Sequence, residues 1–475
     1  EHIFCEFIGA QSLRRSRAIF RFLLNKLGGA EGRGRQTLEC LQRGVGSHFK
    51  ARRLLGALSD RRAQHPYSAA PCSKIKALVV GAGPAGLRFG IEAALLGCDR
   101  VVVIERRTAF SRNNILHLWP FAITDLVQLG AKLLHPGLCV GGINHVGIHT
   151  LQLVLAKLCL IMGVAIHAPV SFVDYVAPTS AAKGWGARLE PEGHLLADEE
   201  WDAIIDGSGP AQVLKGFPHI PTGGLKRAIG LTANFVNSKT RAEVTVPQLP
   251  GLAVHFNQAL FQSLEDKHGI SLENIVYYRG ETHYFVTCAK RNSLVQKGVL
   301  REDLPGDDLL SRENIDGARL NDFLKEVAGF FSHLPPSVLD KWALTASGRP
   351  DVSIFDFTQL HRAEHGAVIR EAHGRRLLTV LIGDALLMSF WPKGTGAAHA
   401  TLSAFDAAWA MRGLAAGDPP LRILAEHAAA YRKLAVAEES SVKTPYDKLT
   451  ADPASRYSFF KPVSESSVEC LYLKE

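Results

Sequence analysis

Paired cysteines are missing from this sequence. Its 475 residues include eight cysteines, which are scattered along the chain, and no two of them form a Cys-x-x-Cys pair. Structural zinc sites and disulfide frameworks require cysteines at closely spaced or regular positions. We therefore expect neither a metal site nor a disulfide framework, and the pattern is typical of a reducing, cytoplasmic compartment.

A long, uninterrupted hydrophobic run is also missing. A membrane-spanning helix needs about 20 consecutive apolar residues. The two most apolar stretches, 151–166 and 377–391, are interrupted by Lys157 and Asp384, so the sequence predicts no membrane span. No secretory signal opens the sequence. Because it begins at Glu1 rather than Met, we expect it to be a processed or excised piece.

Basic residues are concentrated at one end of the chain. Residues 1–66 hold thirteen Lys and Arg against five Asp and Glu, a net charge of +8 that equals the formal charge of the whole chain. Two interpretations stay open: the charges coat a solvated helical surface, or they steer the protein toward an acidic partner. No basic motif interleaved with aromatic residues occurs, so we expect no nucleic acid partner.

The most informative segment is an apolar strand that runs into a glycine-rich turn. Residues 77–88 read Ala-Leu-Val-Val-Gly-Ala-Gly-Pro-Ala-Gly-Leu-Arg, and a second apolar strand ends at Glu105, 24 residues after Gly81. Gly81 permits the tight turn, Gly83 lets the backbone approach a pyrophosphate, and Gly86 lets the next helix pack close to the sheet. Glu105 can accept hydrogen bonds from a ribose. An ordinary strand–turn–helix is the alternative, but the two strands and the terminal acid together favour dinucleotide binding.

Periodicity along the chain predicts an α/β protein with two or three domains. The expected helices lie within 4–65 and at 148–162, 257–268 and 317–333, and the expected strands lie at 164–167, 170–176, 201–206, 228–235, 253–256, 275–278, 283–286 and 377–382.

The later part of the chain completes a recognisable order of motifs. An apolar strand ends in Gly383-Asp384, and Gly394-Thr395-Gly396 then opens a helix. Following a glycine-rich turn, this order resembles that of flavoprotein monooxygenases. The resemblance implies that the aspartate accepts a ribityl hydroxyl of FAD. The dipole of the second helix would then stabilise the reduced, anionic flavin. Gly-Asp by itself is a common turn pair.

Finer motifs resemble one family, the MICAL flavoprotein monooxygenases. They include Glu105 to Phe121, Leu272 to Tyr278, Thr282 to Phe285, Pro350-Asp351-Val352, Phe355 to Thr358, Phe390-Trp391-Pro392, Ala404 to Trp409, and Asp452 to Ala454 with Arg456-Tyr457. The resemblance covers essentially the whole chain, is greatest to the MICAL-1 branch, and stops before the family's calponin-homology and LIM domains.

The resemblance implies a p-hydroxybenzoate hydroxylase-like fold in three parts. A basic helical segment over 1–70 would pack on an FAD-binding domain formed by 71–224 and 356–475, with an inserted monooxygenase domain over 225–355. The activity implied uses FAD, NADPH and O2 to oxidise methionines of filamentous actin to the sulfoxide, which disassembles the filament. Hydrogen peroxide is formed when no filament is present. The implied location is cytoplasmic and cytoskeletal, with regulatory domains beyond this chain.

Site residues follow from the same motifs, and no metal ligands are expected among them. The expected cofactor-binding residues are Gly81, Gly83, Ala85, Gly86, Glu105, Arg106, Arg107, Arg112, Asn113, Asn114, Phe172, Tyr284, Asp384, Gly394 and Gly396. The expected catalytic residues are Trp391, Tyr284 and Asn114, of which Trp391 and Tyr284 would form an aromatic wall beside the flavin. The alternative for Trp391 is core packing, and the alternative for Asn114 is a turn residue.

The chain departs from the family pattern at several positions. Arg106 replaces the usual Lys, and His149 and His399 stand where the family has Arg, which removes two permanent cations. Met388-Ser389 replaces Glu-Pro, and Ser208 stands where many members have Asp. Two other functions therefore stay open: a catalytically weakened module that binds actin or a regulatory partner, and a hydroxylase of small aromatic molecules.

Overall fold

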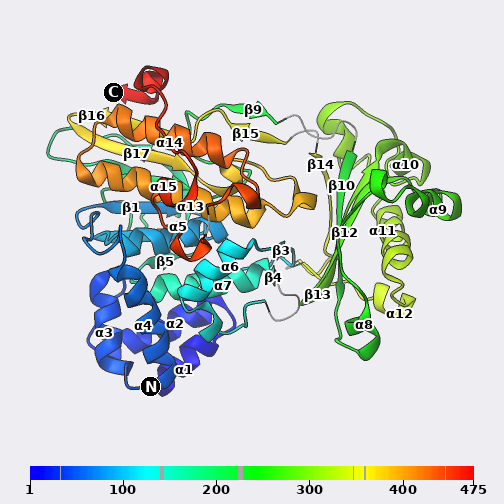
Figure 1. Ribbon diagram of the computed structural model, residues 1–475, viewed down its shortest axis with the longest axis horizontal. Helices are drawn as coiled ribbons and strands as arrows, with labels where there is room; N and C mark the ends of the chain where they lie inside the picture. Colours follow the sequence, from blue (N-terminus) through cyan, green and yellow to red (C-terminus); the bar gives the residue numbers. More distant parts are fainter. Residues whose placement is uncertain are drawn as a thin grey trace.

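Two lobes, each built on one β-sheet, make up the molecule (Figure 1). The computed structural model describes the whole chain except residues 33, 140–143, 223–227, 346, 358–359, 444 and 475. The first lobe holds both ends of the chain, and the second lobe holds the segment from β10 to β14. The expected domain boundary between 224 and 225 lies outside the described residues.

A mostly parallel, seven-stranded sheet forms the centre of the first lobe. Strands β17 to β5 run parallel, and β16 pairs antiparallel with β17. β1 and β2 are runs of Val, Leu and Ile that are buried on both faces, as expected for a parallel sheet covered by helices. In spatial order the strands are β18 (Tyr472–Lys474), β16 (Ala367–Ala372), β17 (Arg375–Leu381), β8 (Ala203–Asp206), β1 (Lys76–Val80), β2 (Arg100–Ile104) and β5 (Ala165–His167).

Helices and small hairpins complete the first lobe. The helices that pack on the sheet or on one another are α5 (Pro84–Leu95), α6 (Pro120–Gln128), α7 (Ile148–Ile161), α13 (Gly396–Ala416), α14 (Pro420–Leu434) and α15 (Pro453–Arg456). The paired short strands are β3 (Ile115–His117) with β4 (His145–Gly147), β6 (Ser171–Val176) with β7 (Gly186–Glu190), and β9 (His219–Pro221) with β15 (His361–Ala363). The predicted α/β, Rossmann-like fold is confirmed.

Four helices precede this sheet, at the lower left of Figure 1. They are α1 (His2–Gly9), α2 (Leu13–Lys26), α3 (Arg35–Val45) and α4 (Phe49–Ala63). Ser12 caps α2 by accepting a hydrogen bond from the Arg15 N–H. Lys157 of α7 is fully buried and donates from Nζ to the carbonyls of Ile8, Ala10 and His135, which ties α1 to the first lobe.

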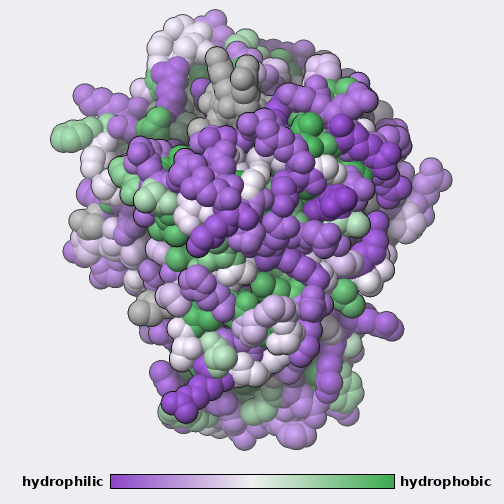
Figure 2. All heavy atoms as spheres, turned by 90° about the vertical axis from the view of Figure 1, so that its right-hand side faces the viewer, coloured by the Kyte–Doolittle hydropathy of each residue, from purple (hydrophilic) through white to green (hydrophobic). Residues whose placement is uncertain are grey.

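An antiparallel, five-stranded sheet forms the second lobe. In spatial order its strands are β11 (Leu249–Ala253), β12 (Leu272–Arg279), β13 (Thr282–Lys290), β10 (Ala228–Val236) and β14 (Val352–Asp356). Its helices are α8 (Arg241–Thr245), α9 (Gln258–His268), α10 (Arg291–Gln296), α11 (Gly317–Ser332) and α12 (Pro336–Leu339). They lie on the side of the sheet away from the first lobe, and the outer surface of the second lobe is mostly hydrophilic (Figures 1 and 2).

One predicted strand is wrong. The run 253–256 was expected to be extended, but β11 ends at Ala253 and Val254–Phe256 forms a 3-10 turn. The strand lies further toward the N-terminus, across Pro250 and Gly251, two residue types that are depleted in strands. Its pairing with β12 is irregular between Leu249 and Leu252, so the strand does not follow a simple apolar alternation.

A buried charge network joins separate parts of the first lobe. Arg88 of α5 donates from Nε to Asp125 at 2.7 Å and from Nη1 to Glu92 at 2.6 Å. Arg61 of α4 lies 3.6 Å from the same Asp125 carboxylate and donates to the carbonyl of Leu449. All four charged side chains are at most 6% exposed. Removing one partner would therefore leave uncompensated charge in the core.

We expect Asp125→Asn to lower the free energy of unfolding by about 3 kcal/mol, because it leaves Arg88 and Arg61 under-compensated in the core. Glu39→Gln, which breaks the exposed Arg35–Glu39 pair at 3.1 Å, is the matched control. It should cost less than about 0.5 kcal/mol. Urea unfolding of both variants checks this, and equal losses would contradict it.

Candidate cofactor and active site

The glycine-rich turn between β1 and α5 leaves no space for larger side chains at two of its three glycines. Gly81 has a φ of +97°, and a Cβ there would lie 2.6 Å from the carbonyl oxygen of Gly207. A Cβ at Gly86 would lie 2.1 Å from the Gly81 carbonyl oxygen. At Gly83 the nearest atom is 3.7 Å away, so that position opens away from the protein. The backbone at the N-terminus of α5 is thereby accessible to an anionic group.

Glu105 follows β2 and reaches back to this turn. It is 2% exposed, and its Oε2 accepts the Ala82 N–H at 3.0 Å. Its Oε1 accepts from the backbone N–H and Nε of Arg107, at 2.9 and 3.0 Å. The carboxylate therefore fixes the shape of the turn, and its remaining lone pairs are available to a ribose hydroxyl.

The second segment of the predicted site meets the first at Ala85. A Cβ added to Gly383 would lie 2.9 Å from the Ala85 Cβ, so β17 delivers Asp384 to the N-terminal turn of α5. Burial raises the pKa of Asp384, and the positive charge of Arg112 opposes that shift. Among the described residues, no side chain or backbone group hydrogen-bonds this carboxylate. A partly buried acceptor without a donor is a natural partner for a ligand hydroxyl.

Two neighbouring asparagines connect the lobes. Asn114 donates from Nδ2 to the Tyr284 hydroxyl at 3.0 Å, across 170 residues of sequence. Asn113 donates to Asp351 of the second lobe at 2.9 Å. Tyr284 is 3% exposed, and burial raises its pKa, so its hydroxyl stays protonated and has a hydrogen to donate. The side chain of Asn114 bonds a distant residue, so Asn114 is more than a turn residue.

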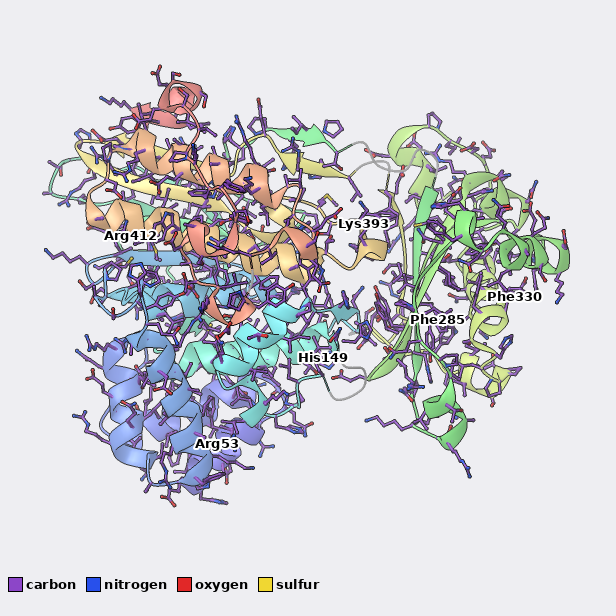
Figure 3. All side chains as sticks on the ribbon, viewed as in Figure 1. Arg53, His149, Phe285, Phe330, Lys393 and Arg412 are labelled. Atoms are coloured by element: carbon purple, nitrogen blue, oxygen red, sulfur yellow. The ribbon has the colours of Figure 1, made fainter. Side chains whose placement is uncertain are left out.

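Trp391 lies at the junction of the lobes but outside the core. It is 40% exposed, and its ring centroid is 4.1 Å from that of Phe355. The alternative of plain core packing is therefore wrong. Gly394 has a φ of +63°, and a Cβ there would lie 3.1 Å from the Cβ of His117. The turn before α13 is thus seated directly on β3, and Figure 3 places Lys393 of this turn toward the second lobe.

Two histidines at this junction were not expected. His117 and His145 face each other across the β3–β4 hairpin, with their ring centroids 5.4 Å apart. The ring of His145 also packs on that of Tyr278 of the second lobe, with a centroid distance of 3.9 Å. Both ring nitrogens of His145 are buried without a partner among the described residues, and burial lowers its pKa to about 4. No spacing signal marks His145, because its environment is created by β12 from 130 residues further along the chain.

The residues that differ from the family pattern lie in different environments. His149 pairs through Nε2 with Glu281 at 2.6 Å and through Nδ1 with the Arg112 carbonyl at 3.1 Å, and Figure 3 shows it at the lobe junction. The hydrogen bond to Glu281 raises the pKa of His149, which partly restores the missing cation. His399 is buried, and burial lowers its pKa, so it is neutral. The Ser208 hydroxyl is buried without a partner among the described residues.

The remaining predicted residues differ in their exposure. Arg106 is exposed, Phe172 of β6 is buried two residues beyond Val170, and the Val170 N–H donates to the Glu105 carbonyl at 2.8 Å. Gly396 begins α13. Within the described part of the chain, no group of three or more His, Cys, Asp or Glu side chains is arranged to hold a metal. No helix there is both long and apolar enough for a membrane crossing.

The sheet order and the helices define an α/β protein whose fold is similar to that of a solved halogenase. The solved chondrochloren halogenase CndH, an FAD-dependent enzyme, superposes with a TM-score of 0.51 at 16% identity, over 76% of this chain and 79% of its own.

Sequence relatives then identify the family. The mouse (Mus musculus) [F-actin]-monooxygenase MICAL3 is 43% identical over 90% of this chain and 22% of its own length. The rat (Rattus norvegicus) MICAL1 is 42% identical over 98% and 45%. The zebrafish (Danio rerio) protein-methionine sulfoxide oxidase mical3a is 42% identical over 86% and 21%. The family model "Mical, Rossman domain" matches residues 227–356.

The matched region therefore belongs to the MICAL family, and the resemblance seen in the sequence is confirmed. The chain spans less than half the length of each of these curated relatives. The family model falls on the second lobe, β10 to β14, rather than on the glycine-rich turn.

We expect the stabilisation from His149 to vanish as pH rises. Its folded-state pKa lies above the unfolded value of 6.5, so the ion pair with Glu281 is complete below about pH 6.5 and is lost as pH rises through the raised pKa. The pair is partly exposed, so its contribution is at most about 1 kcal/mol.

The test compares the free energy of unfolding of the parent protein and His149→Gln between pH 5.5 and 8.5, a range chosen to span about one unit or more on each side of the histidine transition. The difference should shrink toward high pH. His149→Arg, which keeps its charge, should show no such trend, and a pH-independent difference for His149→Gln would contradict the assignment.

Proposed function

We propose that this chain is the monooxygenase part of an FAD- and NADPH-dependent enzyme that oxidises methionines of filamentous actin to the sulfoxide. The observation that supports this most directly is the junction at Ala85 and Gly383, where two distant segments meet beside the partly buried Asp384, whose carboxylate has no hydrogen-bond donor among the described residues. The names of the relatives, [F-actin]-monooxygenase and protein-methionine sulfoxide oxidase, suggest the substrate. The domain limits proposed are 1–70, 71–224 with 356–475, and 225–355.

The residues of the cradle fit FAD in three ways. The free N–H groups at the start of α5, next to Gly83, would bind the pyrophosphate. Asp384 would accept a ribityl hydroxyl, and Glu105 a ribose hydroxyl. When bound there, FAD would supply the redox chemistry that links NADPH to O2.

Around the reacting atoms the protein orients groups and excludes water. Asn114 donates to the Tyr284 hydroxyl, which leaves the tyrosine proton directed to another acceptor at the lobe junction. The rings of Trp391 and Phe355 form an apolar surface against which a methionine side chain can pack. Because a thioether sulfur is a soft nucleophile, no strong base is needed. One oxygen atom of O2 goes to sulfur and the other becomes water, with both electrons coming from NADPH.

The second candidate function is a catalytically weakened module that binds actin or a regulatory partner. It is favoured by His399, which is buried where the family has Arg, and whose pKa is lowered by burial so that it carries no permanent charge. A small-aromatic hydroxylase is the third alternative. We propose a cytoplasmic, cytoskeleton-associated location, with regulatory calponin-homology and LIM domains in the full-length protein.

Stopped-flow reduction of the bound flavin by NADPH, with and without actin filaments, separates these functions. The proposed enzyme binds FAD, bleaches with NADPH, and consumes NADPH faster with filaments but not with phenols. Flavin absorbance that does not bleach indicates the weakened module. Stimulation by phenols indicates the hydroxylase, and failure to bind FAD after reconstitution would refute the enzyme.

Trp391→Ala should lower filament-stimulated turnover by about tenfold or more, because a reacting group that is no longer positioned loses much of its rate. The flavin content and the thermal midpoint should stay near those of the parent protein, because Trp391 is 40% exposed. Trp391→Phe should give an intermediate rate. The measurements are NADPH consumption and the flavin absorbance of the purified protein. Loss of flavin in proportion to activity would place Trp391 in cofactor binding instead.

Reversing the charge of Arg14 and Arg15, both exposed on α2, should weaken filament stimulation by up to about tenfold at low salt, because steering by a basic surface is electrostatic. The matched control reverses Arg432 and Lys433, which are exposed on α14. NADPH consumption against filament concentration measures both variants. Equal effects would show that net charge alone matters, and an unchanged response would remove the steering role of α2.

A further inference from the structure

A cavity lies between α2 and the segments that follow β2 and β5. Its volume is about 410 Å³, and its polar lining comes from Arg14, Arg17, Arg21 and Thr108, closed by Ala168 and Pro169. That volume lies within the range of small-molecule sites, about 300–1,000 Å³. The three arginines are spaced by three and four residues, so they project from one face of the helix.

Two of these arginines have no opposing carboxylate. Arg21 pairs with Glu31 at 3.0 Å. In the part of the chain that the structure describes, neither Arg14 nor Arg17 forms an ion pair. Arg17 is partly buried, and its Nη1 donates a long hydrogen bond to the Ala168 carbonyl at 3.5 Å. Most of the five guanidinium N–H donors of Arg17 are therefore available to a ligand in the cavity.

The electrostatic environment of the cavity is positive. Burial lowers the pKa of Arg17, with Glu31 opposing the shift and Arg21 adding to it. The neighbouring His167 has its pKa lowered to about 4, first by burial and then by the charge of Arg17. An anion in the cavity would raise the pKa values of both Arg17 and His167, because it would place negative charge beside Arg17 and near His167.

The position of the cavity also fits a phosphate ligand. Ala168 directly follows β5, and Thr108 lies four residues after the end of β2, so the cavity opens at the carboxyl ends of two adjacent parallel strands. Parallel α/β sheets bind nucleotides and other phosphates at this edge. Paired arginines are well suited to bind the oxygen atoms of a phosphate.

We propose that the cavity is a second anion site, which binds the phosphate monoester of a small molecule. The phosphate would accept hydrogen bonds from Arg17 and Arg14, with Arg21 held in place by Glu31, and the walls of Ala168 and Pro169 would pack against the rest of the ligand. This goes beyond the proposed function, because it requires neither flavin nor filaments. The phosphate has two candidate sources, the 2′-phosphate of NADPH and a free phosphate compound.

Isothermal titration of the purified chain with inorganic phosphate and with 2′-AMP tests the site directly. Arg17→Gln should raise the dissociation constant for both probes by about tenfold or more, the loss expected for one charge-assisted contact to phosphate. Arg14→Gln, at an exposed position, should give a smaller loss of the same sign. Arg15→Gln is the matched control, because Arg15 is on the same helix but does not line the cavity.

Three further readouts make the proposal falsifiable. Arg17→Lys keeps the positive charge and should retain part of the affinity for phosphate. A loss in Arg17→Gln that Arg17→Lys partly restores cannot come from a folding defect alone. The imidazole resonances of His167 should titrate at a higher pH when phosphate is bound. Titration with NADP+ and NAD+ separates the sources. If Arg17→Gln weakens binding of NADP+ but not of NAD+, the ligand is the 2′-phosphate. If it weakens binding of neither dinucleotide but still weakens binding of inorganic phosphate, the ligand is a free phosphate compound, and equal weakening of both dinucleotides would contradict a monoester site. Absence of phosphate binding, or an equal loss in Arg15→Gln, would overturn the proposal.

Discussion

The buried guanidinium of Arg88 sets the arrangement of the first lobe. It lies on α5, the helix that starts at the glycine-rich turn, and it is bound by Asp125 of α6 and by Glu92 of its own helix. The Cζ atom of Arg88 lies 4.6 Å from the centroid of the Phe405 ring on α13. A buried charge is tolerated only when its partners are in place. The network therefore favours a single packing arrangement of α5, α6 and α13.

The packing of α5 against α13 also determines how the candidate site is assembled. The N-termini of α5 and α13 are the two helix ends expected to face the cofactor, and they come from segments about 300 residues apart. Arg456 continues the network from the other side, pairing with Asp406 of α13 at 2.7 Å and lying 5.5 Å from Phe405. The contact between Ala85 and Gly383, which brings Asp384 into the cradle, depends on this packing.

Local patterns predicted the parts of the protein that are fixed by local chemistry. The turn at Gly81, the strand ending at Glu105 and the helix opening at Gly396 depend on backbone conformation and helix ends, which are written in short segments of sequence. His145 and Asp351 could not be assigned a role in this way, because their surroundings come from strands that pair far away in sequence. The strand expected at 253–256 was wrong because this apolar run forms a 3-10 turn that leads into α9, with Asn257 as the residue directly before that helix.

Polar contacts between the two lobes lie beside an apolar cluster, in which Ile115 of β3 packs against residues of β12 and β13. Asn113 with Asp351, Asn114 with Tyr284, and His149 with Glu281 are hydrogen bonds or ion pairs that join α7 and the loop before β3 to the second sheet. Polar interfaces within a chain are compatible with relative movement of the parts they join. Trp391 and Phe355 lie at this same junction, and Trp391 remains partly exposed. A small change in the angle between the lobes would therefore alter the access of a large substrate to the aromatic pair while leaving the Arg88 network, and with it the cradle, intact.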